Sequence, residues 1–361
     1  MSRILATATV LPEFRYDQAE LTAAAVDMLG LSGTKRQLLE RFHAAAGVKT
    51  RSLVLPIERY AALAGFGEAN DSFLEFAVSG GAHAVRDALA AAGVQPDEVD
   101  ILMTVSVTGI GAPSVDARLV PELGLRADVR RVPVFGLGCV AGAAGLARVH
   151  DMVAGDPDAV AVLLAVEACS LTVQRDDQSA ANMVASALFG DGAAAAVLAG
   201  ERRARQLADN GTARPVPRIV ASRSRLYPDT ERVMGWDVGG TGFRIVLAAS
   251  VADVVEQYVG DDVRAVLAEH GLRVPDVARW MTHPGGPKVL EATARTIGLA
   301  DGELDITWRS LAEVGNLSSA SVLHVLGGTL DDPPPAGSAG VLLAMGPGFC
   351  SEIVLMRWDP W

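Results

Sequence analysis

Short runs that are apolar on both faces alternate along this chain with longer segments of helical composition. Residues 99–109 and 158–169 are two such runs, and residues 71–93 form a helical segment before the first of them. Strands that are apolar on both faces are typical of a sheet covered by helices. A helical segment at 250–271 and a strand-like run at 277–282 repeat the pattern. We therefore predict an α/β fold with two similar halves.

The boundary between the halves is expected in the polar, arginine-rich stretch at 200–218. A chain of 361 residues is longer than one typical domain, and half of its residues are hydrophobic, which allows a large buried core. We place the N-terminal half at residues 1–213 and the C-terminal half at residues 214–361.

Charge and cysteine content exclude several classes of function. The net charge of −12 argues against nucleic-acid binding through a general electrostatic surface. No uninterrupted apolar run approaches the roughly 18–20 residues that span a bilayer, and the first 17 residues lack the apolar core of a signal peptide. Cys139, Cys169 and Cys350 are too widely spaced for a disulfide framework or a zinc site. We therefore expect a cytoplasmic protein without a membrane span.

Cys139 follows Gly136 and Gly138 at the point where a short apolar run turns into a predicted helix. A thiol at a helix N-terminus meets the positive end of the helix dipole, which favours the thiolate and lowers its pKa. Glycine lets the backbone turn sharply there. A buried cysteine is often only a small hydrophobic residue, so its partners decide between the two interpretations.

Two further polar residues lie at similar junctions. His283 ends the strand-like run at 277–282 and begins a Pro/Gly loop that opens a helix, and Asn316 follows a glycine at a helix start. A lone histidine is usually structural, and asparagine is a frequent N-cap. Together with Cys139, however, they form a set in which histidine activates a thiol. Histidine and asparagine can also stabilise a developing enolate or oxyanion.

The sequence resembles the type III polyketide synthases, the chalcone and stilbene synthase-like family. The resemblance rests on "GLGCVAGAAGL", "LFGDGAAAAVL", "TGFRIVL", "HPGGPKVLEA", "GNLSSASVLHVL" and "MGPGF", which occur in the family's order from about residue 40 to the C-terminus. It implies a thiolase fold, with two related halves packed as αβαβα layers, and a homodimer.

The resemblance also implies roles for individual residues. Cys139 is the acyl-accepting nucleophile, while His283 and Asn316 polarise the thioester carbonyl and assist decarboxylation of malonyl-CoA. Phe189 and Phe243 match the two phenylalanines that separate the CoA entrance from a buried cavity. Acyl-CoA and malonyl-CoA are then the substrates, and no further cofactor and no metal are expected.

Some positions depart from the plant enzymes. Ala112 stands where plant members have a methionine that reaches across the dimer. The motif usually written GFGPG reads Ala344-Met345-Gly346-Pro347-Gly348. Arg41 matches one basic position that holds CoA phosphates, whereas Ala44 replaces another. Other cations that could serve are Lys49, Arg51 and Lys288.

The stretches "VEACSLTVQRDD", "MGWDVGGTGF" and "MGPGFCSE" look more like bacterial alkylpyrone and alkylresorcinol synthases than like chalcone synthases. Small side chains at Ala112, Ala185 and Ala187 would leave volume for an alkyl chain. We therefore expect a medium- or long-chain fatty acyl-CoA starter that is extended with malonyl-CoA to an alkylpyrone or alkylresorcinol. Alternatively, neighbouring side chains fill the space, and the starter is short or is malonyl-CoA itself.

Other enzyme classes use the same three residue types. A ketoacyl-acyl-carrier-protein synthase III-like condensing enzyme would share the fold and the triad. A cysteine protease is also compatible with the spacing, since His283 lies 144 residues after Cys139, but the C-G-x-C-W-type signature is absent. A non-catalytic binding module would not need all three polar groups at strand–helix junctions.

Overall fold

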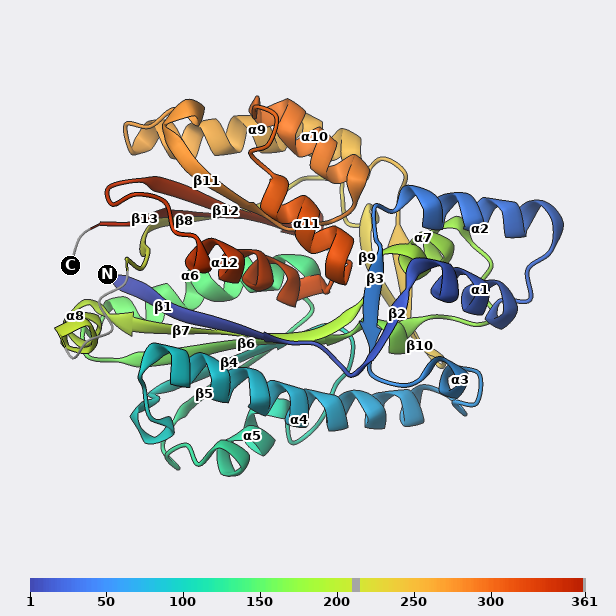
Figure 1. Cartoon of the computed structure of the whole chain (residues 1–361), viewed down its shortest axis with the longest axis horizontal. Helices are drawn as coiled ribbons and strands as arrows, with labels where there is room; N and C mark the ends of the chain where they lie inside the picture. The colour runs from blue at the N-terminus through green and yellow to red at the C-terminus, as the bar shows by residue number, and fades with distance from the viewer. Residues whose placement is uncertain (210–214, 360–361) are drawn as a thin grey trace.

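Two β-layers lie between three layers of helices in the computed structural model, which describes residues 1–209 and 215–359 (Figure 1). The first β-layer contains β1 (Ser2–Val10), β7 (Asp191–Gly200), β6 (Val160–Ala168), β4 (Ile101–Ser106) and β5 (Arg130–Phe135). The second contains β8 (Arg218–Leu226), β13 (Cys350–Arg357), β12 (Ala339–Gly346) and β11 (Val277–Thr282). The two layers are joined where Arg3 of β1 pairs with Arg218 of β8. The predicted five-layer α/β arrangement is confirmed.

The helices fall into an outer, a central and a second outer layer. One outer layer holds α4 (Phe66–Ala92) and α5 (Val115–Leu123), and the other holds α9 (Val251–Glu269) and α10 (Pro287–Ile297). The central layer consists of α6 (Ala141–Ala154) and α12 (Ser321–Asp331), with α11 (Asp305–Val314) beside it. Helix α8 (Glu201–Asp209) follows β7.

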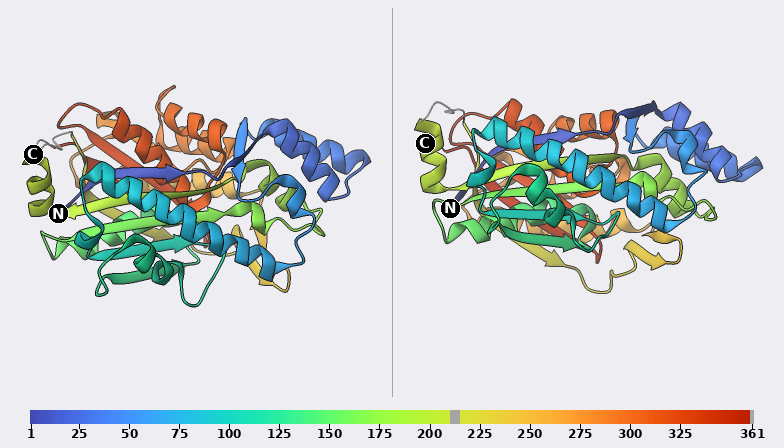
Figure 2. Two further views of the ribbon diagram at one scale, coloured as in Figure 1. Left: turned by 60° about the horizontal axis from the view of Figure 1, so that its bottom comes forward. Right: turned by 90° about the horizontal axis from the view of Figure 1, so that it is seen from below.

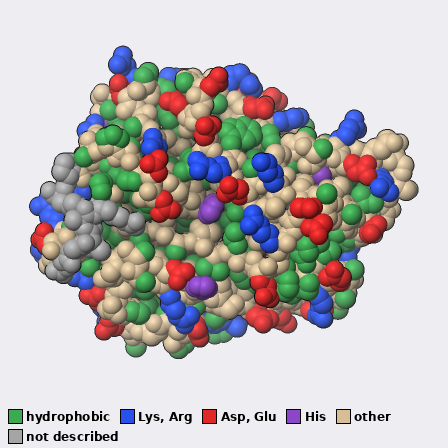
Figure 3. Space-filling model, in the orientation of Figure 1, with side chains coloured by type: hydrophobic (Ala, Val, Ile, Leu, Met, Phe, Trp, Pro, Cys, Tyr) green, Lys and Arg blue, Asp and Glu red, His purple; other side chains and the backbone are tan. Residues whose placement is uncertain are grey.

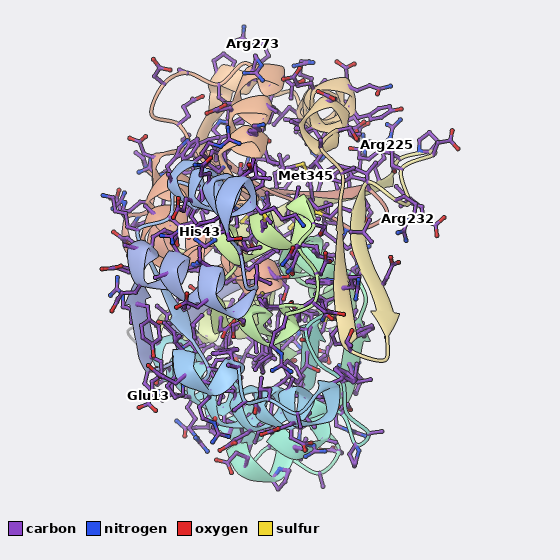
Figure 4. All side chains as sticks on the ribbon, turned by 90° about the vertical axis from the view of Figure 1, so that its right-hand side faces the viewer. Glu13, His43, Arg225, Arg232, Arg273 and Met345 are labelled. Carbon is purple, nitrogen blue, oxygen red and sulfur yellow. The ribbon has the colours of Figure 1, made fainter. Side chains whose placement is uncertain are left out.

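A smaller group of elements extends the molecule at the end opposite both termini (Figures 1 and 2). It contains the helices α1 (Gln18–Met28), α2 (Gly33–Ala45), α3 (Ile57–Tyr60) and α7 (Ala180–Leu188), and the strand pairs β2 (Phe14–Asp17) with β3 (Thr50–Leu53) and β9 (Met234–Gly239) with β10 (Gly242–Leu247). Figure 4 shows the β9–β10 hairpin at the side of the molecule.

The strands expected from the apolar runs are present, and the alanine-rich segment at 191–200 forms β7. Every residue of β7 is buried, because small side chains let α4 and α12 pack against its two faces. The sequence analysis missed β1 and β8, whose alternating alanine, threonine, serine and arginine residues carry little apolar signal. Both strands form because neighbouring strands pair with them.

The expected boundary between residues 213 and 214 lies outside the described residues, so it stays a prediction. None of the helices in the described part of the chain is long and apolar enough to cross a membrane. Acidic and basic side chains are interspersed on the face shown in Figure 3, without an extended basic patch on that face.

The central layer depends on a close backbone approach at Gly142, in the first turn of α6. A Cβ atom on this residue would lie 2.3 Å from the carbonyl oxygen of Ser319 and 2.7 Å from Val322. Ser319 belongs to the short turn Ser318–Ala320 that leads into α12. The two central helices therefore meet at their first turns, where only glycine fits at position 142.

Replacing Gly142 with alanine should force these two turns apart. We expect a loss of about 1–3 kcal/mol in the free energy of unfolding, which is typical of overpacking in a core. Gly155→Ala at the end of the same helix is the matched control, because a Cβ atom on Gly155 would have no neighbouring atom within 4 Å. Urea unfolding measures both variants, and equal stabilities would contradict the proposed contact.

Candidate active site

Cys139 lies in a short turn between β5 and α6, as the sequence predicted. Strand β5 ends at Phe135, a 3₁₀ turn spans Gly138–Val140, and α6 begins at Ala141. Gly136 and Gly138 have φ values of 98° and 57°, a left-handed conformation that glycine adopts without strain. The Cys139 side chain is buried, with 8% of the residue exposed.

The loop Gly346–Gly348 packs directly against the Cys139 turn. A Cβ on Gly138 would lie 2.7 Å from Cδ of Pro347, and a Cβ on Gly346 would lie 2.7 Å from the carbonyl oxygen of Leu137. Of the predicted substrate-binding residues, Gly346 and Pro347 thus lie against the turn that carries Cys139, whereas a Cβ on Gly348 would meet Leu226 instead. Gly138 and Gly346 are needed because this contact leaves no room for a side chain at either position.

Asn316 is fixed by its own turn and by the segment that carries Phe189. Its Oδ1 accepts hydrogen bonds from the Ser318 amide at 2.8 Å and the Ser321 hydroxyl at 3.5 Å. Its backbone amide donates to Leu188 O at 2.8 Å, and its carbonyl accepts from Gly190 N at 3.0 Å. Because Oδ1 is engaged by the turn, the side-chain NH₂ is the group left to donate to a substrate. Phe189 and Asn316 are therefore neighbours through a backbone bridge.

His283 follows β11, and its backbone amide donates to Leu343 O of β12 at 2.8 Å. The residue is 2% exposed, and both ring nitrogens are buried without a hydrogen-bond partner among the described residues. Burial lowers the pKa of the ring to about 3, so the imidazole is neutral at physiological pH. Buried polar groups are nearly always paired, so an unpaired ring indicates a place for a polar ligand atom.

The electrostatics of Cys139 differ from the expectation. Burial raises the pKa of its thiol to about 12; the Ser318 hydroxyl opposes this rise, and the charge of Glu167 adds to it. The expected lowering of the thiol pKa is wrong for this structure, because burial disfavours the charged thiolate. The thiol must therefore lose its proton to a base when it reacts, and His283 is the base that the sequence analysis expects for this step.

Two residues beside Cys139 escaped the sequence analysis. Ser318, which has a φ of 50°, places its Oγ 3.6 Å from the Cys139 Sγ and connects that thiol to the Asn316 turn. Glu167 at the end of β6 is fully buried and accepts hydrogen bonds from Thr108 Oγ1 at 2.7 Å and from the Ser319 hydroxyl. An acidic residue inside an otherwise apolar run was the signal that could have identified Glu167.

A cavity of about 330 Å³ is lined by Phe189 but not by Cys139, His283 or Asn316. Phe189 and Ala185 line it, together with Arg51, Tyr60, Cys169, Trp236 and Ile245 among others. Ala187 instead packs in a separate apolar cluster with Leu188, Leu290 and Leu311, and Ala112 lies exposed on its loop. Of the three alanines expected to leave volume for an alkyl chain, only Ala185 borders this cavity.

Phe243 lies on β10 and is buried in an aromatic cluster. Its ring is 5.3 Å from Phe66, 5.9 Å from Phe135 and 6.5 Å from Trp236, measured between ring centroids. Trp236 lines the cavity, whereas Phe243 does not line it and packs behind Trp236. The predicted CoA contact Arg41 lies exposed on α2, and no described carboxylate pairs with it.

Comparisons with known proteins agree with this geometry. Residues 70–232 match the family model of FAE1/type III polyketide synthase-like proteins, and residues 218–359 match the C-terminal domain of chalcone and stilbene synthases. A 1,3,6,8-tetrahydroxynaphthalene synthase from Streptomyces peucetius subsp. caesius is 53% identical over 98% of this chain and 93% of that protein. A 3,5-dihydroxyphenylacetyl-CoA synthase from Streptomyces toyocaensis is 31% identical over 99% of this chain and 90% of that protein.

The chain belongs to the type III polyketide synthases. The crystal structure of 1,3,6,8-tetrahydroxynaphthalene synthase from Streptomyces coelicolor A3(2), a bacterial member, matches it with a TM-score of 0.91 and 30% identity over 99% of this chain and 100% of that one. The predicted thiolase fold and acyl-transferring, condensing activity are thereby confirmed. Enzymes of this family act on CoA thioesters and need no further cofactor. The protease interpretation and the carrier-protein synthase interpretation are set aside.

Removing the His283 ring should make Cys139 harder to ionise. In His283→Ala we expect slower alkylation by iodoacetamide at pH 7 and a pH–rate profile shifted to higher pH, because a buried thiol without a base ionises only at higher pH. Peptide mass spectrometry in a Cys350→Ser background follows Cys139 without the more exposed Cys350. His324→Ala, which removes a histidine on α12, is the control. Identical profiles for both variants would contradict the assigned role.

Proposed function

We propose that this type III polyketide synthase loads an acyl group from CoA onto Cys139 and extends it with malonyl-CoA at His283 and Asn316. The observation that carries the proposal is the buried imidazole of His283, whose two ring nitrogens have no partner among the described residues. Its neutral state lets it accept the thiol proton during loading. During extension, the His283 ring and the Asn316 NH₂ group both donate hydrogen bonds to the substrate.

In the loading step, the Cys139 proton moves to the His283 ring, and the thiolate attacks the thioester carbonyl of acyl-CoA. The bond from that carbonyl to the CoA sulfur breaks, and the CoA thiolate takes the proton from His283. This leaves the acyl group on Cys139 and the imidazole neutral again. Arg41, exposed on α2 without a carboxylate partner among the described residues, is our proposed contact for the CoA phosphates.

In the extension step, the bond between the carboxylate and the methylene carbon of malonyl-CoA breaks and releases carbon dioxide. The electron pair forms an enolate, whose oxygen accepts hydrogen bonds from the His283 ring and the Asn316 NH₂ group. The enolate carbon attacks the acyl carbonyl on Cys139, and the thiolate leaves. The chain is then two carbons longer and is carried by CoA.

We propose a polyhydroxylated aromatic product made from malonyl-CoA alone, rather than an alkylpyrone or alkylresorcinol. The relative that is 53% identical is named for 1,3,6,8-tetrahydroxynaphthalene, whose ring oxygens follow the alternating pattern that two-carbon units leave. The cavity of about 330 Å³ is at the lower end of the roughly 300–1,000 Å³ range of small-molecule sites. The expected fatty acyl starter loses support because Ala112 and Ala187 do not border the cavity.

The purified enzyme should therefore form a ten-carbon aromatic product from malonyl-CoA without any other acyl-CoA. Liquid chromatography and mass spectrometry would identify it. Reactions with acyl-CoAs of two to sixteen carbons, added in competition, serve as the comparison. Products that contain the added acyl chain, in yields that rise with chain length and without product from malonyl-CoA alone, would restore the fatty acyl hypothesis.

We also propose a cytoplasmic homodimer. Its three cysteines are free, as expected in a reducing compartment. Strand β5 is at the edge of the described sheet, and an uncovered edge is a template for pairing with another chain. Phe135 at its end is 51% exposed, and Ile110 on the loop after the neighbouring β4 is 46% exposed. A second copy would cover both side chains and place its Ala112 loop close to this one.

A charge in this surface should weaken the dimer. We expect Ile110→Asp to shift the sedimentation coefficient from the value of a dimer to that of a monomer at micromolar concentration, because a carboxylate would be desolvated at the interface. Met152→Asp, at an exposed apolar residue on α6, is the control. A monomeric wild-type protein, or an Ile110→Asp dimer as tight as the wild type, would contradict this surface.

A further inference from the structure

Arg51 on β3 is a buried cation with no anionic partner in contact among the described residues. It is 3% exposed, and none of the described carboxylates lies within 4.0 Å of its guanidinium nitrogens. Burial lowers its pKa to about 10, with the more distant Asp191 opposing the shift, so Arg51 stays charged at neutral pH. Burying a charge without a counter-ion costs free energy. The hydrogen-bond partners of Arg51 should therefore explain why it is buried here.

Those hydrogen bonds go to the end of α7. Arg51 Nη1 donates to the carbonyl oxygen of Phe189 at 2.7 Å, and Nη2 donates to Gln18 Oε1 at 3.0 Å. Gln18 Nε2 donates in turn to the carbonyl oxygen of Ala187 at 2.9 Å. Carbonyls at a helix C-terminus lack helical partners and interact favourably with positive charge. Arg51 and Gln18 therefore cap the segment on which Phe189 lies.

The Arg51 side chain also lies between two glycines that flank the Phe189–Asn316 bridge. A Cβ on Gly315 would lie 2.9 Å from Arg51 Cδ, and a Cβ on Gly190 would lie 3.5 Å from Arg51 Cβ. Gly190 follows Phe189, and Gly315 precedes Asn316. The Arg51 side chain thus lies against both segments of the bridge, the one that carries Phe189 and the one that carries Asn316.

We propose that Arg51 is a positioning residue that holds Phe189 and Asn316 in register with each other. It contacts Phe189 through a hydrogen bond, and Asn316 through Gly315 and the backbone bridge. This inference rests on the roles proposed above for these two residues. Because Arg51 also lines the cavity of about 330 Å³, its loss would change both the extension rate and the space for the growing chain.

The fork of the guanidinium is needed for this arrangement. Two nitrogens donate in two directions at once, to a backbone carbonyl and to Gln18. A lysine ammonium keeps the charge but is a point donor without that planar geometry. Arg51→Lys keeps the positive charge that Arg51→Met removes. It should nevertheless recover only part of the activity that Arg51→Met loses.

The test measures three steps separately in Arg51→Met and Arg51→Lys. Acyl transfer to Cys139 is followed by intact-protein mass spectrometry, malonyl-CoA decarboxylation by release of labelled carbon dioxide, and product length by chromatography. We expect loading to stay near the wild-type rate. Decarboxylation kcat should fall about 100-fold in Arg51→Met, the order of loss that small misplacements of a reacting group produce. The KM of Arg51→Met for malonyl-CoA should change little, and this variant should accumulate shorter products.

Two controls separate positioning from general destabilisation. Arg175→Met removes an arginine that also donates to two backbone carbonyls, Ala61 O at 2.6 Å and Leu63 O at 2.7 Å, away from the Asn316 turn. Val263→Ala removes buried apolar volume in α9 and supplies a variant with lowered thermal stability. Both should keep wild-type decarboxylation and product length. Equal losses in Val263→Ala and Arg51→Met at matched stability would overturn the inference.

Further variants keep the inference testable if Arg51→Met does not fold. Gln18→Ala removes one partner of Arg51 and should lower decarboxylation in the same direction by a smaller factor, and guanidinium ion added to Arg51→Ala should partly restore it. A wild-type rate in Gln18→Ala, with no rescue of Arg51→Ala, would contradict the inference.

Asn316→Ala tests the proposed function on its own. Loss of one oxyanion donor costs about 100- to 1000-fold in decarboxylation. If Asn316→Ala decarboxylates normally, the assigned role of Asn316 fails, and the inference that depends on it fails too. If Asn316→Ala is impaired but Arg51→Met is not, only the inference about Arg51 fails.

Discussion

The structure depends on how closely the first turns of α6 and α12 approach each other in the central layer. At Gly142 the backbone of one half of the chain touches the backbone of the other at Ser319, and at Gly138 it touches Pro347. Helices buried between two sheets can meet this closely only where side chains are absent. The same contacts bring the Cys139 turn beside the turn that carries Asn316. Packing of the two halves therefore also places Cys139 beside the Asn316 turn.

Burial determines the chemistry of that site. It raises the pKa of the Cys139 thiol and lowers the pKa of the His283 ring, so both groups are neutral in this structure. In the proposed mechanism, the His283 ring accepts a proton in the loading step and donates a hydrogen bond to the enolate in the extension step. A low-dielectric site also strengthens each hydrogen bond to the enolate oxygen. Exclusion of water protects the acyl-thioester from hydrolysis.

The lining of the cavity follows from contacts that no short motif encodes. Ala185, Ala187 and Ala112 look alike in the sequence, yet one borders the cavity, one packs against α10 and α11, and one is exposed. The direction of each depends on how α7 and the loop after β4 lie on the rest of the molecule. Arg51 shows the same dependence, since its partners Gln18 and Phe189 are far apart in sequence.

The sequence by itself determined the alternation of strands and helices, and the three junctions at which Cys139, His283 and Asn316 lie. These are local properties: apolar runs form buried strands, and glycines mark the turns that end them. Tertiary structure alone decided that the weakly patterned β1 and β8 are strands, because their partners supply the hydrogen bonds. It also decided the raised pKa of Cys139 and the contacts of Ser318, Glu167 and Arg51. Desolvation and contacts between distant segments exist only after the chain has folded.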